Sequence, residues 1–185
     1  MAQERVAARE KLQPLVQRLA HVSRTDFLAQ HKEPILVQLT EPEGSNVGGA
    51  RFGTLSMSKE ELVFVESGLY AFPLRKATTN AFAMMITVGR ASNNDIVLPY
   101  DGISKFHAYF SNTPTGWTIQ DAKSMNGTHV SGQKLAPDQK APLDLSRPDR
   151  PVDVQFSSVV KCKLYSPEGF FDLVTSLLAV LKPRG

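Results

Sequence analysis

The stretch from Thr87 to His107 reads TVGRASNNDIVLPYDGISKFH. It places a Gly-Arg pair after an apolar run, a polar Asn-Asn-Asp before a second apolar run, and Ser-Lys-Phe-His after the turn formers Tyr-Asp-Gly. Short apolar runs that alternate with turn residues are typical of β-strands joined by tight loops. Because loops carry binding groups more often than strands do, the polar residues of this stretch are the first candidates for function.

The same strand signals continue on both sides of this stretch. The dipeptides Asn126-Gly127 and Ser131-Gly132 are typical of tight turns, because glycine accepts the positive φ angles that such turns require. Many short strands at close spacing predict an all-β fold, a β-sandwich over residues 60–165. The runs that we expect to be strands are 34–39, 61–66, 68–74, 83–89, 95–99, 107–112, 117–121, 152–156 and 160–165.

The N-terminal part of the chain has a different, helical pattern. We expect residues 1–45 to be a helical N-terminal extension with a short strand, and the turn-rich residues 46–59 to be a loop or linker. Pro14 either kinks the first helix or lies in its first turn, and a second helix should begin after Ser23 or Thr25 as N-cap. The first helix would present one apolar face, made of Leu12, Leu15, Val16 and Leu19.

Residues 166–185 predict a C-terminal amphipathic helix. Ser166 is a good N-cap, Pro167 suits the first helical position, and Pro183 should end the helix. The helix either packs on the sandwich or serves in self-association or partner binding. Its apolar stripe is Phe170, Leu173, Val174, Leu177, Leu178 and Leu181.

Composition limits the classes of protein that this chain can belong to. Hydrophobic residues are 42% and charged residues 21% of 185, as in globular proteins, and no apolar run reaches the ~20 residues of a membrane span. We therefore expect a cytoplasmic protein without a membrane partner. The single Cys162 excludes an internal disulfide, and the four histidines show no ligand-like pairing, so we expect no metal and no cofactor. A net charge of +3 from scattered Lys and Arg does not favour nucleic-acid binding.

Donor groups from separate loops could form an anion site. Arg90 follows one apolar run, and Ser104 and Lys105 follow a turn, so a planar guanidinium, a hydroxyl and an ammonium could converge. A phosphorylated hydroxyl carries roughly −1.5 to −2 charges and three acceptor oxygens, which these donors complement. Asn126, from a third loop, offers an amide that can bond to a peptide backbone.

The ordered set of motifs resembles the forkhead-associated (FHA) domain family over about residues 88–135. The family pattern is Gly-Arg, Asn-Asp-Ile, Ser-x-x-His and Asp-x-x-Ser-x-Asn-Gly-Thr, in that order. The residues that match it are Gly89-Arg90, Asn94-Asp95-Ile96, Ser104, His107, Asp121, Ser124 and Asn126-Gly127-Thr128.

The resemblance implies a β-sandwich whose loops bind phosphothreonine peptides. Arg90 and Ser104 would contact the phosphate, with Lys105 adding charge, and Asn126 would hold the peptide backbone. The implied role is an adaptor in signalling by an upstream Ser/Thr kinase. Three residues would support the site from within, namely Gly89, His107 and Gly127.

The chain departs from the family pattern beside the site. Met125 stands where many relatives carry a small polar or basic residue that touches the ligand. A flexible thioether would make a softer and more apolar wall for the peptide. We therefore expect Met125 to alter the selectivity for peptide side chains.

The same residues also allow other interpretations. Arg90 could pair with Asp95 or Asp101 on the surface, and the sandwich could serve phosphorylation-independent assembly as a scaffold. Ser104, His107 and Asp121 also have the residue types of an acyl-transfer triad. No Gly-x-Ser-x-Gly elbow surrounds the serine, so we expect a binding module with no catalytic residues rather than an enzyme.

Overall fold

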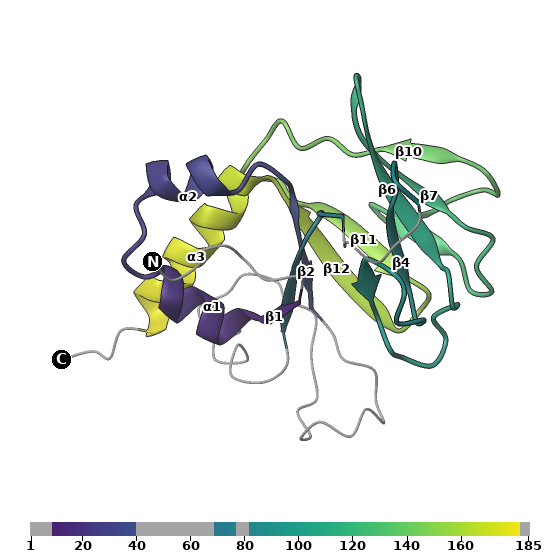
Figure 1. Ribbon diagram of the computed structural model, residues 1–185, viewed down its shortest axis with the longest axis horizontal. Helices are drawn as coiled ribbons and strands as arrows, with labels where there is room; N and C mark the ends of the chain where they lie inside the picture. Colours follow the sequence, from purple (N-terminus) through teal and green to yellow (C-terminus); the bar gives the residue numbers. More distant parts are fainter. Residues whose placement is uncertain (1–8, 40–68, 77–81, 182–185) are drawn as a thin grey trace.

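The computed structural model describes residues 9–39, 69–76 and 82–181. Two β-sheets pack face to face, and three helices cover the outer face of one of them, so the chain forms three layers (Figure 1). The predicted β-sandwich with an N-terminal helical part and a C-terminal helix is confirmed. The predicted strand at 61–66 and the linker at 46–59 lie outside the described residues, and the domain boundaries given above remain predictions.

The first sheet has seven antiparallel strands in the order β1-β3-β2-β12-β11-β8-β9. β2, from the predicted N-terminal extension, pairs with β3 and β12 in the interior of this sheet. Residues far apart in the sequence therefore share one sheet. Its strands are β1 (Glu10–Lys11), β2 (Ile35–Gln38), β3 (Tyr70–Pro73), β8 (Thr128–Val130), β9 (Gln133–Lys134), β11 (Val152–Phe156) and β12 (Val160–Tyr165).

The second sheet has five strands in the order β10-β7-β6-β4-β5. All neighbours are antiparallel except β4 and β5, which run parallel. Parallel neighbours cannot be joined by a two-residue hairpin, and residues 90–95 form the connection between them. The strands are β4 (Ile86–Gly89), β5 (Ile96–Val97), β6 (Ala108–Thr113), β7 (Gly116–Asp121) and β10 (Lys140–Pro142).

Four short strands were not among those that the sequence predicted. β1, β8, β9 and β10 have two or three residues each, too few to show an alternating pattern. The turn predicted at Ser131-Gly132 is found between β8 and β9. Both residues have positive φ angles, of 48° and 81°. These strands form because neighbouring strands offer unpaired backbone groups, which is a tertiary effect.

The main core lies between the two sheets. Its side chains come from alternating positions of the facing strands, including Val88, Phe110, Ile119, Val154 and Phe156, all at most 1% exposed. Phe110 and Phe156 meet edge to face across the sheets, with ring centroids 6.5 Å apart. This packing fixes both sheets relative to each other, and with them the loops at their ends.

The helices begin where local sequence signals place them. α1 (Leu12–Leu19) has Pro14 in its first turn, where a backbone N–H has no intrahelical partner and its absence costs no hydrogen bond. α2 (Arg24–Gln30) has Ser23 as its N-cap, not Thr25, because the Ser23 hydroxyl accepts a hydrogen bond from the backbone N–H of Asp26 at 3.1 Å. α3 (Pro167–Leu181) begins after Ser166, whose hydroxyl accepts from Gly169 N–H at 3.1 Å.

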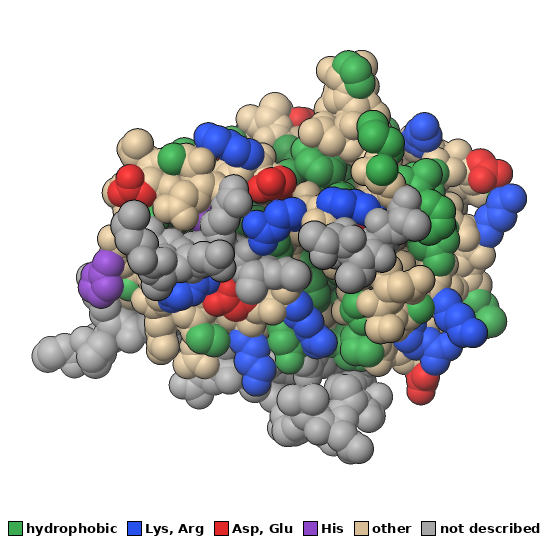
Figure 2. Space-filling view, in the orientation of Figure 1, with side chains coloured by type: hydrophobic (Ala, Val, Ile, Leu, Met, Phe, Trp, Pro, Cys, Tyr) green, Lys and Arg blue, Asp and Glu red, His purple; other side chains and the backbone are tan. Residues whose placement is uncertain are grey.

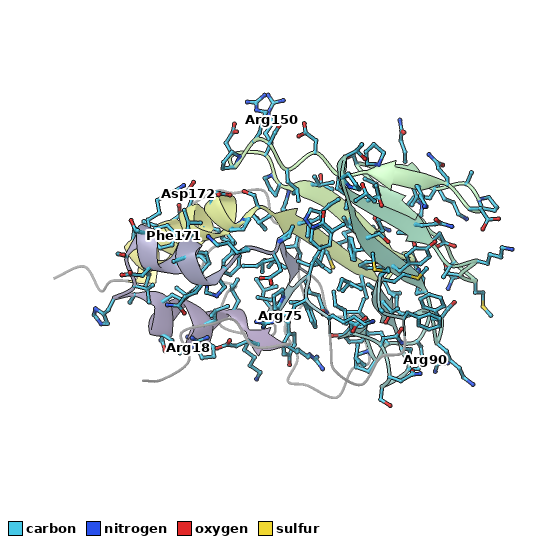
Figure 3. All side chains as sticks on the ribbon, turned by 45° about the horizontal axis from the view of Figure 1, so that its top comes forward. Arg18, Arg75, Arg90, Arg150, Phe171 and Asp172 are labelled. Atoms are coloured by element: carbon cyan, nitrogen blue, oxygen red, sulfur yellow. The ribbon has the colours of Figure 1, made fainter. Side chains whose placement is uncertain are left out.

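A second core joins the helices to the outer face of the seven-stranded sheet. Phe27 of α2 stacks on Phe170 of α3 at 6.1 Å between centroids, and Tyr165 of β12 meets Phe170 edge to face. An ion pair between Arg24 and Asp172 closes the surface of this layer, where Figure 3 labels Asp172 beside Phe171. The prediction that the C-terminal helix packs on the sandwich is confirmed. No helix among the described residues is long and apolar enough to span a bilayer.

A substitution at Gly169 would show how closely α3 approaches the loop before β11. Replacing glycine by alanine inside a helix usually stabilises it, but here an added Cβ would overlap the Pro148 carbonyl oxygen. We expect Gly169→Ala to lower the free energy of unfolding by about 1–3 kcal/mol in a urea titration. Ser176→Ala, on the exposed side of the same helix, should change it by less than about 0.5 kcal/mol. A stabilised Gly169→Ala variant would contradict the close contact.

Candidate functional site

Three loops meet at one end of the sandwich. They join β4 to β5, β5 to β6, and β7 to β8, and they carry the residues that the sequence predicted for the site except Gly89, which is the last residue of β4. Figure 3 labels Arg90 at the end of the molecule opposite the helices. The site therefore lies far from the helical layer, on backbone that the two sheets hold in place.

The carbonyl group of Lys105 joins the first two loops. It accepts hydrogen bonds from the Ala91 N–H at 3.2 Å and from the Asn94 side-chain amide at 2.7 Å, while Arg90 N–H donates to Ser104 O at 2.9 Å. Gly89 is buried directly against this carbonyl, and a Cβ there would also lie 2.9 Å from Asn94 Nδ2. Glycine is thus required by the close approach of two backbones, and Arg90 is held beside Ser104.

Asp95 anchors the loop between β4 and β5 through its buried side chain. Its buried carboxylate accepts from Thr87 N–H at 2.8 Å, from the Thr87 hydroxyl at 3.0 Å and from Lys76 Nζ at 2.9 Å. Lys76, more than fifteen residues away in the sequence, completes the charge balance that a buried carboxylate needs.

His107 ties the second loop to the third. Its Nδ1 accepts from the Ser104 N–H at 3.1 Å, so its other nitrogen carries the proton and donates to the Gly127 carbonyl at 3.2 Å. The ring is fully buried and edge-on to Phe156 at 5.8 Å. Burial lowers the pKa of His107 below its usual value, although the bond to Gly127 and the charge of Asp121 oppose the shift.

Asp121 shapes the third loop. Its carboxylate accepts from the Ser124 N–H at 2.8 Å, the Ser124 hydroxyl at 2.7 Å and the Thr128 hydroxyl at 2.6 Å. Burial alone would raise the pKa of Asp121, but these hydrogen bonds outweigh it and hold the pKa below its usual value. Gly127 lies inside this turn with a φ of 82°, which glycine adopts without strain.

The phosphate-binding candidates lie on the solvent side of this network. The Arg90 side chain is 48% exposed, with its guanidinium 3.7 Å from the exposed Asp101 carboxylate. Such a long, exposed ion pair contributes at most about 1 kcal/mol and is easily exchanged for a stronger anion. Of the two surface pairings considered from the sequence, Asp101 is the one found, because Asp95 is engaged by Lys76.

Ser104 and Asn126 each join two loops and keep bonding capacity. The Ser104 hydroxyl oxygen accepts from the Met125 N–H at 3.0 Å, so its proton can be donated to a ligand. Asn126 donates one amide hydrogen to the Gly102 carbonyl at 2.8 Å, which leaves its second hydrogen and its oxygen for a peptide. Lys105 is exposed, and Met125 is 88% exposed at the rim of the third loop.

The triad residue types are not arranged for catalysis. His107 bonds to the backbone N–H of Ser104 rather than to its hydroxyl, and its second nitrogen is used by Gly127. A general base must reach the nucleophile's proton. The carboxylate of Asp121 bonds to Ser124 and Thr128 instead of orienting the imidazole.

Sequence reasoning missed the residues that only the fold brings to the site. Lys76 and Gly102 become partners of Asp95 and Asn126, and although Gly102 lies in the Tyr-Asp-Gly turn, no local motif predicts either contact. Phe82 likewise stacks on Phe106 at the edge of the site, although 24 positions separate them. A lone lysine or phenylalanine carries no signal of such contacts.

Three end loops, tied together by a buried histidine, hold exposed cationic and polar side chains at one end of the β-sandwich. The family model described as "FHA domain" matches residues 86–149, about a third of the chain, which contains all three loops. This match confirms the resemblance to the FHA family that the ordered motifs indicated.

Curated proteins resemble part of this chain. The ABC transporter ATP-binding/permease protein Rv1747 of Mycobacterium tuberculosis is 44% identical over 50 residues, which are 27% of this chain and 6% of that protein. The transcriptional regulatory protein EmbR of Mycobacterium bovis is 36% identical over 64 residues, which are 35% of this chain and 15% of that protein. The chain thus spans only a small part of the length of either relative.

Solved structures are also similar. The FHA domain of an Arabidopsis thaliana hypothetical protein has a TM-score of 0.47 and 18% identity, covering 74% of this chain and 86% of that one. The Slr1951 protein from Synechocystis sp. has a TM-score of 0.45 and 16% identity, covering 72% of this chain and 95% of that one.

The buried His107 predicts a pH-dependent stability. The unfolded chain takes up this proton near pH 6.5, whereas the folded protein resists it, so the free energy of unfolding should fall as the pH drops below 6.5. Urea titrations between pH 7.5 and 5.5 should show this fall, with a shallower one in a His107→Gln variant. His21→Gln, which changes an exposed histidine of the helical part, should keep the full slope. Equal slopes in all three proteins would contradict the role of His107.

Proposed function

We propose that the FHA domain of this chain binds a phosphothreonine peptide at the three end loops. The observation that carries the proposal is the convergence of Arg90 and Ser104, whose backbones are hydrogen-bonded at 2.9 Å, while the Arg90 side chain is half-exposed and the Ser104 hydroxyl can still donate its proton. The binding of phosphothreonine is also what the FHA family implies. The Arg90 guanidinium and the Ser104 hydroxyl would bond to phosphate oxygens, and Lys105 would add a positive charge.

The site suits a dianionic ligand because its buried carboxylates are engaged away from the exposed donors. Asp95 pairs with Lys76, Asp121 accepts from Ser124 and Thr128, and the neutral His107 adds no charge. The exposed Asp101 carboxylate lies 3.7 Å from the Arg90 guanidinium, and a phosphate, which carries more charge, would displace it. Each charge-assisted hydrogen bond to phosphate is worth about 1.5–3 kcal/mol, so two or three of them can hold a short peptide.

Asn126 would orient the peptide backbone, and Met125 would line its path. Asn126 is itself held by the Gly102 carbonyl, so it is in place before the ligand arrives. Binding to a rigid, prepared surface costs less conformational entropy than binding to a loose one. The chain then acts as an adaptor without catalytic residues, which brings its partners to a threonine that a Ser/Thr kinase has phosphorylated.

Replacing Arg90 provides the direct test. Arg90→Ala should weaken binding of a fluorescent phosphothreonine peptide by about a hundredfold in a polarisation titration, because one bidentate phosphate contact of about 3 kcal/mol is lost. The melting temperature should stay unchanged, since the side chain is half-exposed. Arg150→Ala is the matched control, because Figure 3 places this exposed arginine on a loop far from Arg90.

Two further measurements separate phosphate recognition from a phosphorylation-independent assembly role. Treating the partner with phosphatase should abolish binding, and raising the salt concentration should weaken it because exposed charges are screened. Unchanged binding in Arg90→Ala, or capture of the dephosphorylated partner with equal affinity, would overturn the proposal and favour assembly.

A further inference from the structure

A strip of exposed aromatic side chains begins beside the candidate phosphate site. Phe82 stacks on Phe106 with ring centroids 5.8 Å apart and planes 6° apart, and Phe106 stacks on Tyr109 at 6.1 Å and 22°. Phe82 is 54% exposed and Phe106 is 37% exposed. Large apolar side chains exposed side by side in this way mark binding surfaces more often than isolated ones do.

The strip lies on the outer face of the five-stranded sheet, which the helices do not cover. Tyr109 alternates along β6 with Ala108 and Phe110, which point into the core, so its ring faces outward. The helices lie across the other sheet (Figure 1). Figure 2 shows hydrophobic side chains exposed among Lys and Arg side chains on the sandwich half of the molecule.

The backbone on both sides of the stack is held in place. Phe106 lies between Lys105, whose carbonyl is fixed by Ala91 and Asn94, and the buried His107. The chain before β4 turns back, with Met85 N–H donating to the Phe82 carbonyl at 3.1 Å. The Lys76 ammonium then holds the Met85 carbonyl at 2.9 Å. The strip is therefore preorganised and does not need to be built by a ligand.

We propose that this aromatic strip, made of Phe82, Phe106 and Tyr109, binds a large apolar side chain of the same phosphopeptide, two or three residues from the phosphothreonine. The proposal rests on the proposed function and adds a sequence preference to it. The ligand class is a phosphothreonine peptide with a nearby aromatic or large aliphatic residue.

The distances in an extended peptide support this spacing. An extended chain rises about 3.3 Å per residue, so a residue two or three positions from the phosphothreonine lies roughly 7–10 Å away. Phe106 directly follows Lys105, whose Cα must be about 3.8 Å from that of Phe106, and a phenylalanine ring extends several ångströms beyond its own Cα. One peptide can therefore place its phosphate at Arg90, Ser104 and Lys105 and an apolar side chain on the strip.

The charges near the strip favour a peptide over a second copy of this chain as its occupant. Lys105 adjoins Phe106, and Arg90 follows β4 and is hydrogen-bonded through its backbone N–H to the Ser104 carbonyl, so a ligand that covers both the strip and these loops meets two cations. A phosphopeptide supplies the complementary negative charge, whereas a symmetric partner would bring its own Lys105 and Arg90 toward these cations.

A peptide array tests the preference. It presents one phosphothreonine in an alanine-rich background, with Phe, Leu, Ser or Asp at each position from three residues before it to three after it. We expect the parent protein to bind the best Phe or Leu peptide about tenfold more tightly than its Ser counterpart. Phe106→Ala and Phe82→Ala should each reduce that ratio to near one while still binding the Ser peptide. Met84→Ala removes a side chain that is 81% exposed and outside the stack, and it should keep the ratio.

The possible outcomes distinguish this inference from the proposed function. If the parent protein binds no phosphopeptide, the phosphothreonine function fails and the inference fails with it. If the phosphopeptides bind through Arg90 without an apolar preference, or with a preference that Phe106→Ala and Phe82→Ala leave unchanged, only the inference is overturned. A concentration-dependent dimer that both variants abolish, without any change in peptide selectivity, would overturn it in favour of self-association. Thermal melts of both variants show that a loss of preference is not a loss of fold.

Discussion

The hydrogen bonds to the Lys105 carbonyl are the contact on which the binding surface depends. The carbonyl oxygen accepts hydrogen bonds from the Ala91 backbone N–H and the Asn94 side-chain amide. It fits only because Gly89 has no Cβ. Because the bonded groups belong to two loops, the loops cannot move apart without exposing buried donors. Arg90 and Ser104 lie on the outer side of this junction, so their relative position follows from the backbone and not from any attraction between their side chains.

Two buried polar centres extend this constraint to the third loop. His107 accepts a hydrogen bond from the Ser104 N–H and donates one to the Gly127 carbonyl. Asp121 accepts hydrogen bonds from the hydroxyls of Ser124 and Thr128. Burial holds the pKa of His107 below its usual value and hydrogen bonds hold that of Asp121 below its usual value, so the imidazole stays neutral and the carboxylate ionised at neutral pH. A site built in this way separates two tasks. The interior orients the loops through hydrogen bonds, and the exposed side chains are left to meet the ligand.

The sequence predicted those parts of the molecule that have local signals. Glycine, Asn-Gly and capping serines act over a few residues, so the turns, the helix starts at Ser23 and Ser166 and most long strands could be predicted. The ordered motifs also pointed to the family, because their spacing reflects one network of loop contacts. The short strands β1 and β10, and the contacts of Lys76 and Gly102, could not be predicted in this way. They arise when distant segments meet, and a single sequence without a motif does not specify which segments meet.

The unequal covering of the two sheets explains where the chain can contact other molecules. The helices bury the outer face of the seven-stranded sheet with Phe27, Phe170 and their neighbours, which makes that face part of the structure. The outer face of the five-stranded sheet keeps Tyr109 and Phe106 at the surface, next to the cationic loops. An apolar surface that continues directly into a charged one suits a ligand with both kinds of group. A phosphorylated peptide segment has both, since its phosphate and its side chains lie along one extended backbone, and the rigid sandwich holds the two receiving surfaces at a constant spacing.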